Sequence, residues 1–418
     1  MKSALRCHTL SLSAAAALLA GCGGSQLPIG APGEMPQHLQ GEPALSFMHR
    51  ARGPAYRVLY SFRSRSDGMH PSAGVIDVND ALYGTTAGGG SAGKGTVYRV
   101  SPTGEERVLH SFGHGSDGGG PVGLIDVHGT LYGATGGGGT FGRGTVFSMS
   151  TMGAEKALYS FQLGSNGWAP SSQLVDANGA LYGTTSWGGQ GCGSTGCGVV
   201  YQISTTGSEK TMYRFKGGSA GAYLPEGRLL YLNGVVYGST NLGGGTGCYY
   251  HHGCGTVFSI TTTGKENWLY SFTGGSNGSY PEAGLIDVNG ALYGTTSAGG
   301  DAGGGTVYRI STGGAESVVH RFRGLHSGPI DPETGLVHVD GMLYGTTTAG
   351  GSHNAGTVYS ISPAGAVKIL HNFAGGSADG LYPLGTLIYS HGTLYGTTYY
   401  GGGGGQGTCC GTVFALTL

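Results

Sequence analysis

Three glutamates stand at matching places in a sequence that repeats itself. Each follows a proline, in Pro225-Glu226, Pro281-Glu282 and Pro332-Glu333. Carboxylate oxygens that meet in one place can hold Ca²⁺, and like-charge repulsion among them can raise a pKa enough for general acid–base chemistry. Glu226, Glu282 and Glu333 are therefore the candidate catalytic residues, with solvated turn residues as the alternative. Ca²⁺ is the ion that such a cluster of oxygens would hold, and no other cofactor is expected.

Aromatic side chains form a second candidate group. They fall in glycine-rich loops and in the links between repeats, where flat rings on a weakly charged surface suit stacking against sugars. Packing over the ends of the strands is the alternative. The candidate ligand-binding residues are Trp168, Trp187, Tyr249, Tyr250, Tyr399 and Tyr400, and Tyr223, Tyr280 and Tyr382 occupy similar segments.

Six cysteines also fall in the glycine-rich loops, as the pairs Cys192/Cys197, Cys248/Cys254 and Cys409/Cys410. Even numbers and local pairing in an exported chain favour disulfides. The first two pairs can each close a small loop. The adjacent pair requires either a strained vicinal bridge or partners elsewhere. Histidines between Cys248 and Cys254 are metal-ligand types, but the spacing is not a known zinc spacing, so a disulfide is favoured there.

These residues are positioned by a repeat that occurs seven times. Its clearest copy contains Leu292-Tyr293-Gly294-Thr295-Thr296, and its tyrosines recur at spacings of 49, 50, 55, 56, 51 and 51 residues. Each copy has a short apolar run, an Asn-Gly hairpin or its equivalent, and three further β-rich segments, without any helical period. The sequence therefore predicts one four-stranded antiparallel sheet per repeat, with the apolar run innermost. The glutamates directly precede innermost strands, so they should line one arc of a channel mouth.

The outer-strand motif predicts how the repeats close. Its first copy, Leu59-Tyr60-Ser61-Phe62, precedes the first inner strand, whereas the last repeat lacks an outer strand. We expect an all-β, seven-bladed propeller in which the N-terminal strand 57–62 completes the last blade, because closure removes free sheet edges. An open β-solenoid is the alternative, and it does not explain the separated strand.

The motifs Leu-Tyr-Gly-Thr-Thr, Gly-Thr-Val-Tyr and Leu-Tyr-Ser-Phe resemble the GloVer tandem repeat over residues 57–418. This family is named for Gloeobacter and Verrucomicrobia and occurs in bacterial "choice-of-anchor" proteins. The resemblance implies a surface protein whose repeats are kept while the anchor varies. It implies no catalytic residues. A looser likeness to kelch blades supports the fold alone.

The N-terminus predicts such an anchor. Lys2 and Arg6 precede the apolar run 10–20, which is too short for a comfortable membrane span. The run ends in Leu19-Ala20-Gly21-Cys22, which resembles a lipoprotein lipobox and implies lipidation of Cys22. An ordinary signal peptide is the alternative. Residues 1–21 are thus expected to be a signal peptide, 22–55 a flexible tether and 56–418 the propeller. The expected location is the cell envelope, at the outer membrane.

Composition excludes some partners. Charged residues are 10% of the chain, the net charge is −1 and no basic patch is visible, which argues against nucleic acid. We expect a monomer that meets the membrane through its lipid. The favoured hypothesis is that the protein is a non-catalytic scaffold that binds carbohydrate or protein on its loop face. The alternatives are a polysaccharide hydrolase or lyase that uses the glutamates, and a purely structural envelope protein.

Overall fold

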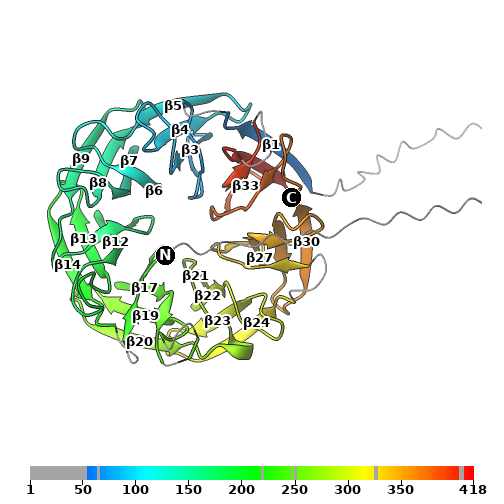
Figure 1. The fold of residues 1–418 in the computed structure, drawn as a ribbon. Coiled ribbons are helices and arrows are strands. Elements are labelled where there is room, and N and C mark those ends of the chain that lie inside the picture. Colours follow the sequence, from blue (N-terminus) through cyan, green and yellow to red (C-terminus); the bar gives the residue numbers. More distant parts are fainter. Residues whose placement is uncertain are drawn as a thin grey trace, which may run out of the picture. The chain divides into compact units, whose positions relative to one another are not determined.

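The computed structural model describes residues 54–63, 66–217, 221–245, 247–248, 252–323, 328–403 and 409–418. The chain divides into two units, 1–51 and 52–418, and every described residue belongs to the second. This unit is a ring of seven antiparallel sheets (Figure 1). The predicted seven-bladed β-propeller is therefore confirmed.

The first three blades follow one another along the chain. In each blade the four main strands pair in sequence order, from the channel to the rim. Blade 1 has β2 (Ile76–Val78), β3 (Ala81–Thr86), β4 (Thr96–Val100) and β5 (Glu106–Ser111); blade 2 has β6 (Gly119–Val127), β7 (Thr130–Gly137), β8 (Thr145–Ser150) and β9 (Glu155–Ser160); blade 3 has β11 (Val175–Ala177), β12 (Ala180–Trp187), β13 (Val199–Ser204) and β14 (Glu209–Arg214). In blade 3, β10 (Trp168–Pro170) also pairs with β12.

The next three blades repeat the same order. Blade 4 has β16 (Leu230–Leu232), β17 (Val235–Thr240), β19 (Thr256–Thr261) and β20 (Glu266–Ser271); blade 5 has β21 (Ile286–Val288), β22 (Ala291–Thr296), β23 (Thr306–Ser311) and β24 (Glu316–Arg321); blade 6 has β26 (Val337–Val339), β27 (Met342–Thr347), β29 (Thr357–Ile361) and β30 (Val367–Asn372). Shorter elements precede or follow them: β15 (Ala222–Tyr223) pairs with β18 (Leu242–Gly243), β25 (Pro329–Ile330) pairs with β28 (Ala349–Gly350), and the 3-10 helix η2 spans Gly275–Asn277.

Blade 7 joins the two ends of the described chain. Its strands are β32 (Ile388–Ser390), β33 (Thr393–Thr398) and β35 (Thr412–Thr417), and its outer strand is β1 (Ala55–Ser61). β1 pairs with β35 antiparallel, from Ala55 opposite Thr417 to Ser61 opposite Thr412. The N-terminal strand thus closes the ring, as the position of its motif predicted. β31 (Gly380–Leu381) and β34 (Tyr400–Gly401) form a small pair beside this blade.

The glycine of Leu-Tyr-Gly-Thr-Thr is required by close packing within a blade. In blade 5 a Cβ on Gly294 would lie 2.4 Å from the hydroxyl of Tyr308, and a Cβ on Gly133 in blade 2 would lie 2.5 Å from the ring of Phe147. The aromatic residue of the third strand therefore lies across the glycine of the second strand. Any side chain at this glycine would displace a fully buried ring.

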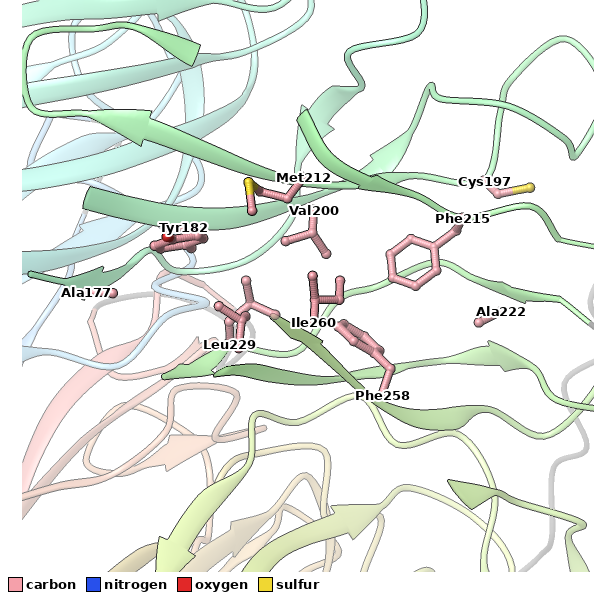
Figure 2. Packing of buried hydrophobic residues seen from close by; sticks show 11 residues of the cluster. Ala177, Tyr182, Cys197, Val200, Met212, Phe215, Ala222, Leu229, Phe258 and Ile260 are labelled. Atoms are coloured by element: carbon pink, nitrogen blue, oxygen red, sulfur yellow. The ribbon is translucent and has the colours of Figure 1, made fainter. Parts of the chain in front are cut away.

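Aromatic rings also join neighbouring blades. Each outer strand is followed by a buried phenylalanine whose ring meets, edge to face, the third-strand aromatic of the next blade. Phe215 of blade 3 meets Phe258 of blade 4 at 5.2 Å and 68°, within the cluster drawn in Figure 2. At the closing seam, Phe62 meets Tyr98 of blade 1 at 5.0 Å and 69°. Such pairs stabilise an interface beyond the burial of apolar area, so the same edge-to-face contact stabilises every interface between blades.

The hairpins between the innermost and second strands adopt the expected tight form. Asn289 and Gly290 have φ of 54° and 79°, as a two-residue turn of type I′ requires. Within the described ranges no helix is long and apolar enough to cross a membrane.

Candidate functional site

The loop face rests on a rigid backbone. Each link between blades contains a proline at an equivalent position of the repeat, here called the link proline. The residue before it has a left-handed backbone in every blade, with φ between 55° and 62°: His70, Gly120, Ala169, Leu224, Tyr280, Asp331 and Tyr382. Its N–H donates to the preceding blade, as in Tyr280 N–H to Cys254 O at 2.8 Å and His70 N–H to Cys410 O at 2.9 Å. Left-handed residues other than glycine persist only where their surroundings hold them. The links between blades are therefore fixed platforms for side chains.

Trp168 and Trp187 form one aromatic pair on these platforms. They lie opposite each other on β10 and β12, with ring centroids 6.0 Å apart and planes 27° from parallel. The guanidinium carbon of Arg143 lies 4.8 Å from the centre of the Trp168 ring. Both indoles are partly exposed. Trp168 also packs against the buried core between blades 2 and 3, so part of this pair serves blade packing and part faces solvent.

Tyr399 and Tyr400 belong to a second aromatic cluster. Their centroids are 4.7 Å apart, and the ring of His70 lies 4.6 Å from Tyr399 and 5.1 Å from Tyr400. Tyr382 lies 5.9 Å from Tyr400 and is 40% exposed. His70 comes from the link into blade 1, so the cluster crosses the closing seam. Burial lowers the pKa of His70, which keeps this imidazole neutral near pH 7.

Two of the predicted aromatic residues, Tyr249 and Tyr250, lie outside the described residues, as does Cys22. Trp268, whose place in an outer strand suggests packing, does lie on the outer strand β20 but is 36% exposed.

The three glutamates meet at the mouth of the channel. A cavity of about 130 Å³ is lined there by the residues that follow the link prolines of all seven blades: Ser72, Val122, Ser171, Glu226, Glu282, Glu333 and Leu384. The amide Nδ2 of Asn241 donates to Glu226 Oε2 at 3.1 Å and to Glu282 Oε1 at 3.3 Å. These two carboxylate oxygens are therefore at most about 6.4 Å apart, the sum of the two distances.

The environment of the middle glutamate favours its neutral form. Burial, followed by the charges of Glu333 and Glu226, raises the pKa of Glu282 to about 7. Burial also raises the pKa of Glu226 and of Glu333, and Asp331 adds to the shift at Glu333. A carboxyl that titrates near neutrality beside an ionised one can act as an acid and base pair. The same oxygens could bind Ca²⁺ if Asn241 turned its amide oxygen inward.

One other set of described side chains has metal-ligand types in reach of one another. Donor atoms of Asp77, Asp80 and His391 lie within 4.8 Å. Ser390 already donates to Asp77 at 2.6 Å, and His391 lies 3.5 Å from Asp80. This group is a surface ion-pair network, and it gives no reason to assign a metal.

The cysteines pair within their loops. Cys192 is bonded to Cys197 and Cys248 to Cys254, as predicted. Cys409 is bonded to its neighbour Cys410, so the vicinal bridge rather than a distant partner is found. All three bridges lie in the loops that carry or border the aromatic residues.

Sequence reasoning missed three members of these groups: Arg143, His70 and Asn241. His70 could have been found, because it occupies the pre-proline position that Tyr280 and Tyr382 hold in other blades. Asn241 directly follows the second strand, where four other repeats have Ser, Thr or Ala. Nothing in its residue type predicts that its side chain would donate hydrogen bonds to two glutamates.

Comparisons with known proteins support the architecture. The chain matches the Gloeobacter/Verrucomicrobia repeat over residues 40–250 and again over 244–414. A search of curated proteins found no match. Among solved structures, the chain is similar to a "putative 6-phosphogluconolactonase" from Bacteroides uniformis ATCC 8492, at 15% identity and a TM-score of 0.45, covering 72% of this chain and 84% of that one. A likeness of that degree carries no argument about activity. Because the repeat matches almost all of the propeller, this chain belongs to the Gloeobacter/Verrucomicrobia repeat family.

Proposed function

We propose that this protein is a non-catalytic binding module of the cell envelope that holds a carbohydrate on its loop face. The observation that carries the proposal is the partly exposed Trp168–Trp187 pair, fixed on paired strands. Sugars present faces rich in C–H groups, which pack well on flat rings, and hydroxyls that polar neighbours can bind. Arg143 beside Trp168 supplies hydrogen-bond donors at this position.

The second aromatic cluster supports the same proposal. Tyr382, Tyr399, Tyr400 and His70 bring ring faces and hydroxyl donors together across the seam. Rings placed in separate blades suit an extended polymer better than a single sugar unit, because several weak contacts act together along one chain. A lipid on Cys22 and a tether up to residue 55 would hold the propeller at the outer membrane, where polysaccharides are abundant.

The test is binding of soluble polysaccharides to the purified protein, measured by calorimetry across a panel of neutral and acidic polymers. Trp187→Ala should weaken binding of the best polymer at least about tenfold, which corresponds to about 1.4 kcal/mol. Trp268→Ala is the matched control, because this tryptophan lies on the rim. Equal losses in both variants, or no binding of any polymer by the unaltered protein, would contradict the proposal. In the second case a protein ligand on this face becomes the better explanation.

A polysaccharide hydrolase or lyase is the second candidate, favoured by the channel mouth. Oε2 of Glu226 and Oε1 of Glu282 are at most about 6.4 Å apart, which does not exceed the separation of about 5 to 9.5 Å that paired carboxyl groups of glycosidases use. Glu282, with its pKa near 7, would be the proton donor. The measurement is release of reducing ends or of unsaturated products from the same polymers. Glu282→Gln should abolish that release while binding at Trp187 is kept. An unaltered protein that binds but releases nothing excludes this candidate.

A further inference from the structure

The waist of the channel is formed by one position of the repeat. This position lies two residues after the glutamate position in six blades and directly after it in blade 2. It is held by Gly74, Gly123, Gln173, Arg228, Gly284, Gly335 and Thr386. The glycines bring backbones close together: a Cβ on Gly74 would lie 2.2 Å from the carbonyl oxygen of Thr386. In this ring of small and neutral residues, Arg228 is the one that carries a charge.

Arg228 has no partner in the described part of the chain. None of the described carboxylates lies within 4.0 Å of its nitrogens, and burial alone acts on its pKa, which it lowers. By contrast, the amide of Gln173 in the same ring donates to the carbonyl of Leu124. The side chain of Arg228 is accessible inside the lumen, although protein walls surround the lumen and reduce its hydration. Its guanidinium can therefore be reached by a ligand, and the reduced hydration strengthens a charge-assisted hydrogen bond to an anion.

Arg228 lies between two cavities. One is the channel mouth with the three glutamates; the other, of about 440 Å³, extends along the innermost strands of blades 5, 6 and 7. The larger cavity is lined by Asp287, His338 and Tyr389, which are equivalent residues of those strands. Its volume lies within the range of small-molecule sites, about 300 to 1,000 Å³.

The walls of the larger cavity offer backbone groups. β21, β26 and β32 each pair on one side only, because each is the innermost strand of its sheet. Consecutive residues of each strand line the cavity, such as Leu285, Ile286 and Asp287, so the backbone edge rather than one side-chain face borders it. An edge strand presents N–H and C=O groups that no neighbouring strand uses. These groups can bind hydroxyls.

We infer that the larger cavity binds a small anionic sugar, with its carboxylate or phosphate on Arg228 and its hydroxyls on the strand edges. The planar guanidinium of Arg228 matches either anion through two parallel hydrogen bonds. Asp287 lines the same cavity and repels an anion, so the anionic group should lie at the Arg228 end and the sugar hydroxyls toward Asp287. This site is separate from the aromatic pair on the loop face, and the inference does not depend on carbohydrate binding there.

The same geometry predicts an effect on stability. A partly desolvated cation without a partner costs free energy, so its removal should stabilise the fold or leave it unchanged. Gln is the suitable replacement, because Gln173 already fits the equivalent position in blade 3. A structural arginine would give the opposite result, a lower melting temperature in Arg228→Gln.

The experiment is calorimetric titration of the purified protein with glucuronate, glucose 6-phosphate and glucose. At least one anionic sugar should bind, and glucose should bind at least tenfold more weakly. Arg228→Gln should lose at least tenfold in affinity for that anion while melting no lower than the unaltered protein. Arg107→Gln is the matched control, since Arg107 is exposed on β5, and its affinity should be unchanged. Preference for glucuronate or for glucose 6-phosphate identifies the anion.

The inference would be overturned by no binding of either anionic sugar, by equal binding of glucose, or by undiminished binding by Arg228→Gln. A loss of binding that accompanies a lower melting temperature would also overturn it, because Arg228 would then be structural. Trp187→Ala should leave this binding unchanged, so failure at the loop face and failure at the waist are distinguishable.

Discussion

Replacing Phe62 by alanine tests the closure of the ring. Phe62 directly follows β1 and is fully buried, with its ring 5.0 Å from Tyr98 of the next blade and 5.2 Å from Tyr60. Removal of a buried phenylalanine ring costs about 3 to 5 kcal/mol, of which the edge-to-face contact accounts for about 0.5 to 1.5 kcal/mol. We expect Phe62→Ala to lower the free energy of unfolding by that amount.

The assay is equilibrium unfolding in urea, followed by tryptophan fluorescence. Two variants frame the result. Phe112→Ala removes the equivalent ring between blades 1 and 2, where Phe112 meets Phe147 at 5.1 Å, and should cost about as much. Phe141→Ala removes a ring that is 55% exposed and should change stability by less than about 0.5 kcal/mol. A value for Phe62→Ala close to that of Phe141→Ala would refute the closure, since β1 would then contribute nothing to its interface.

Two further predictions concern the blade interior and the interfaces. Gly294→Ala should destabilise the fold by about 1 to 3 kcal/mol, because its Cβ would lie 2.4 Å from the Tyr308 hydroxyl. Gly313→Ala, whose Cβ would meet nothing closer than 3.7 Å, is the control in the same unfolding experiment, and equal effects would contradict the packing argument. Burial, with added repulsion from nearby aspartates, raises the pKa of Glu106 and Glu155 from 4.5 to about 7 in the folded state. Their stabilising contribution is complete below about pH 4.5 and is lost as the pH rises through about 7, so the double variant Glu106→Gln/Glu155→Gln should lose less melting temperature between about pH 6 and pH 8 than the unaltered protein. An identical pH dependence in both proteins would show that these carboxyls are not protonated in the fold.

The architecture could be predicted from the sequence because the motifs of each repeat indicate the order of its four strands. Asn289-Gly290 fixes one hairpin, and the separated outer strand before the first repeat requires a partner, which the last blade supplies. The arc of glutamates followed from the same register, since equivalent positions of a ring must lie at the same height. Periodicity therefore fixes where a side chain belongs, whatever its type.

Periodicity does not reveal interactions between side chains of different blades. The side chain of Asn241 donates hydrogen bonds to both Glu226 and Glu282. Asn241 follows the second strand of blade 4, and Glu282 belongs to the next blade, so these hydrogen bonds depend on how the two blades pack. Arg228 could have been noticed as the one charge among equivalent positions held by glycine, threonine and glutamine. Its lack of a partner, however, is a property of the surrounding channel and appears only in three dimensions.

The pairing of β1 with β35 also means that the order of the blades along the chain is not needed for the fold. Ala55 lies opposite Thr417 on adjacent antiparallel strands, so a short linker could join these two residues. New ends could then be opened in an exposed link between two blades, such as the segment around Leu163, which is 61% exposed. In such a circular permutant all four strands of blade 7 would be covalently continuous, and a different blade interface would lie between the new ends.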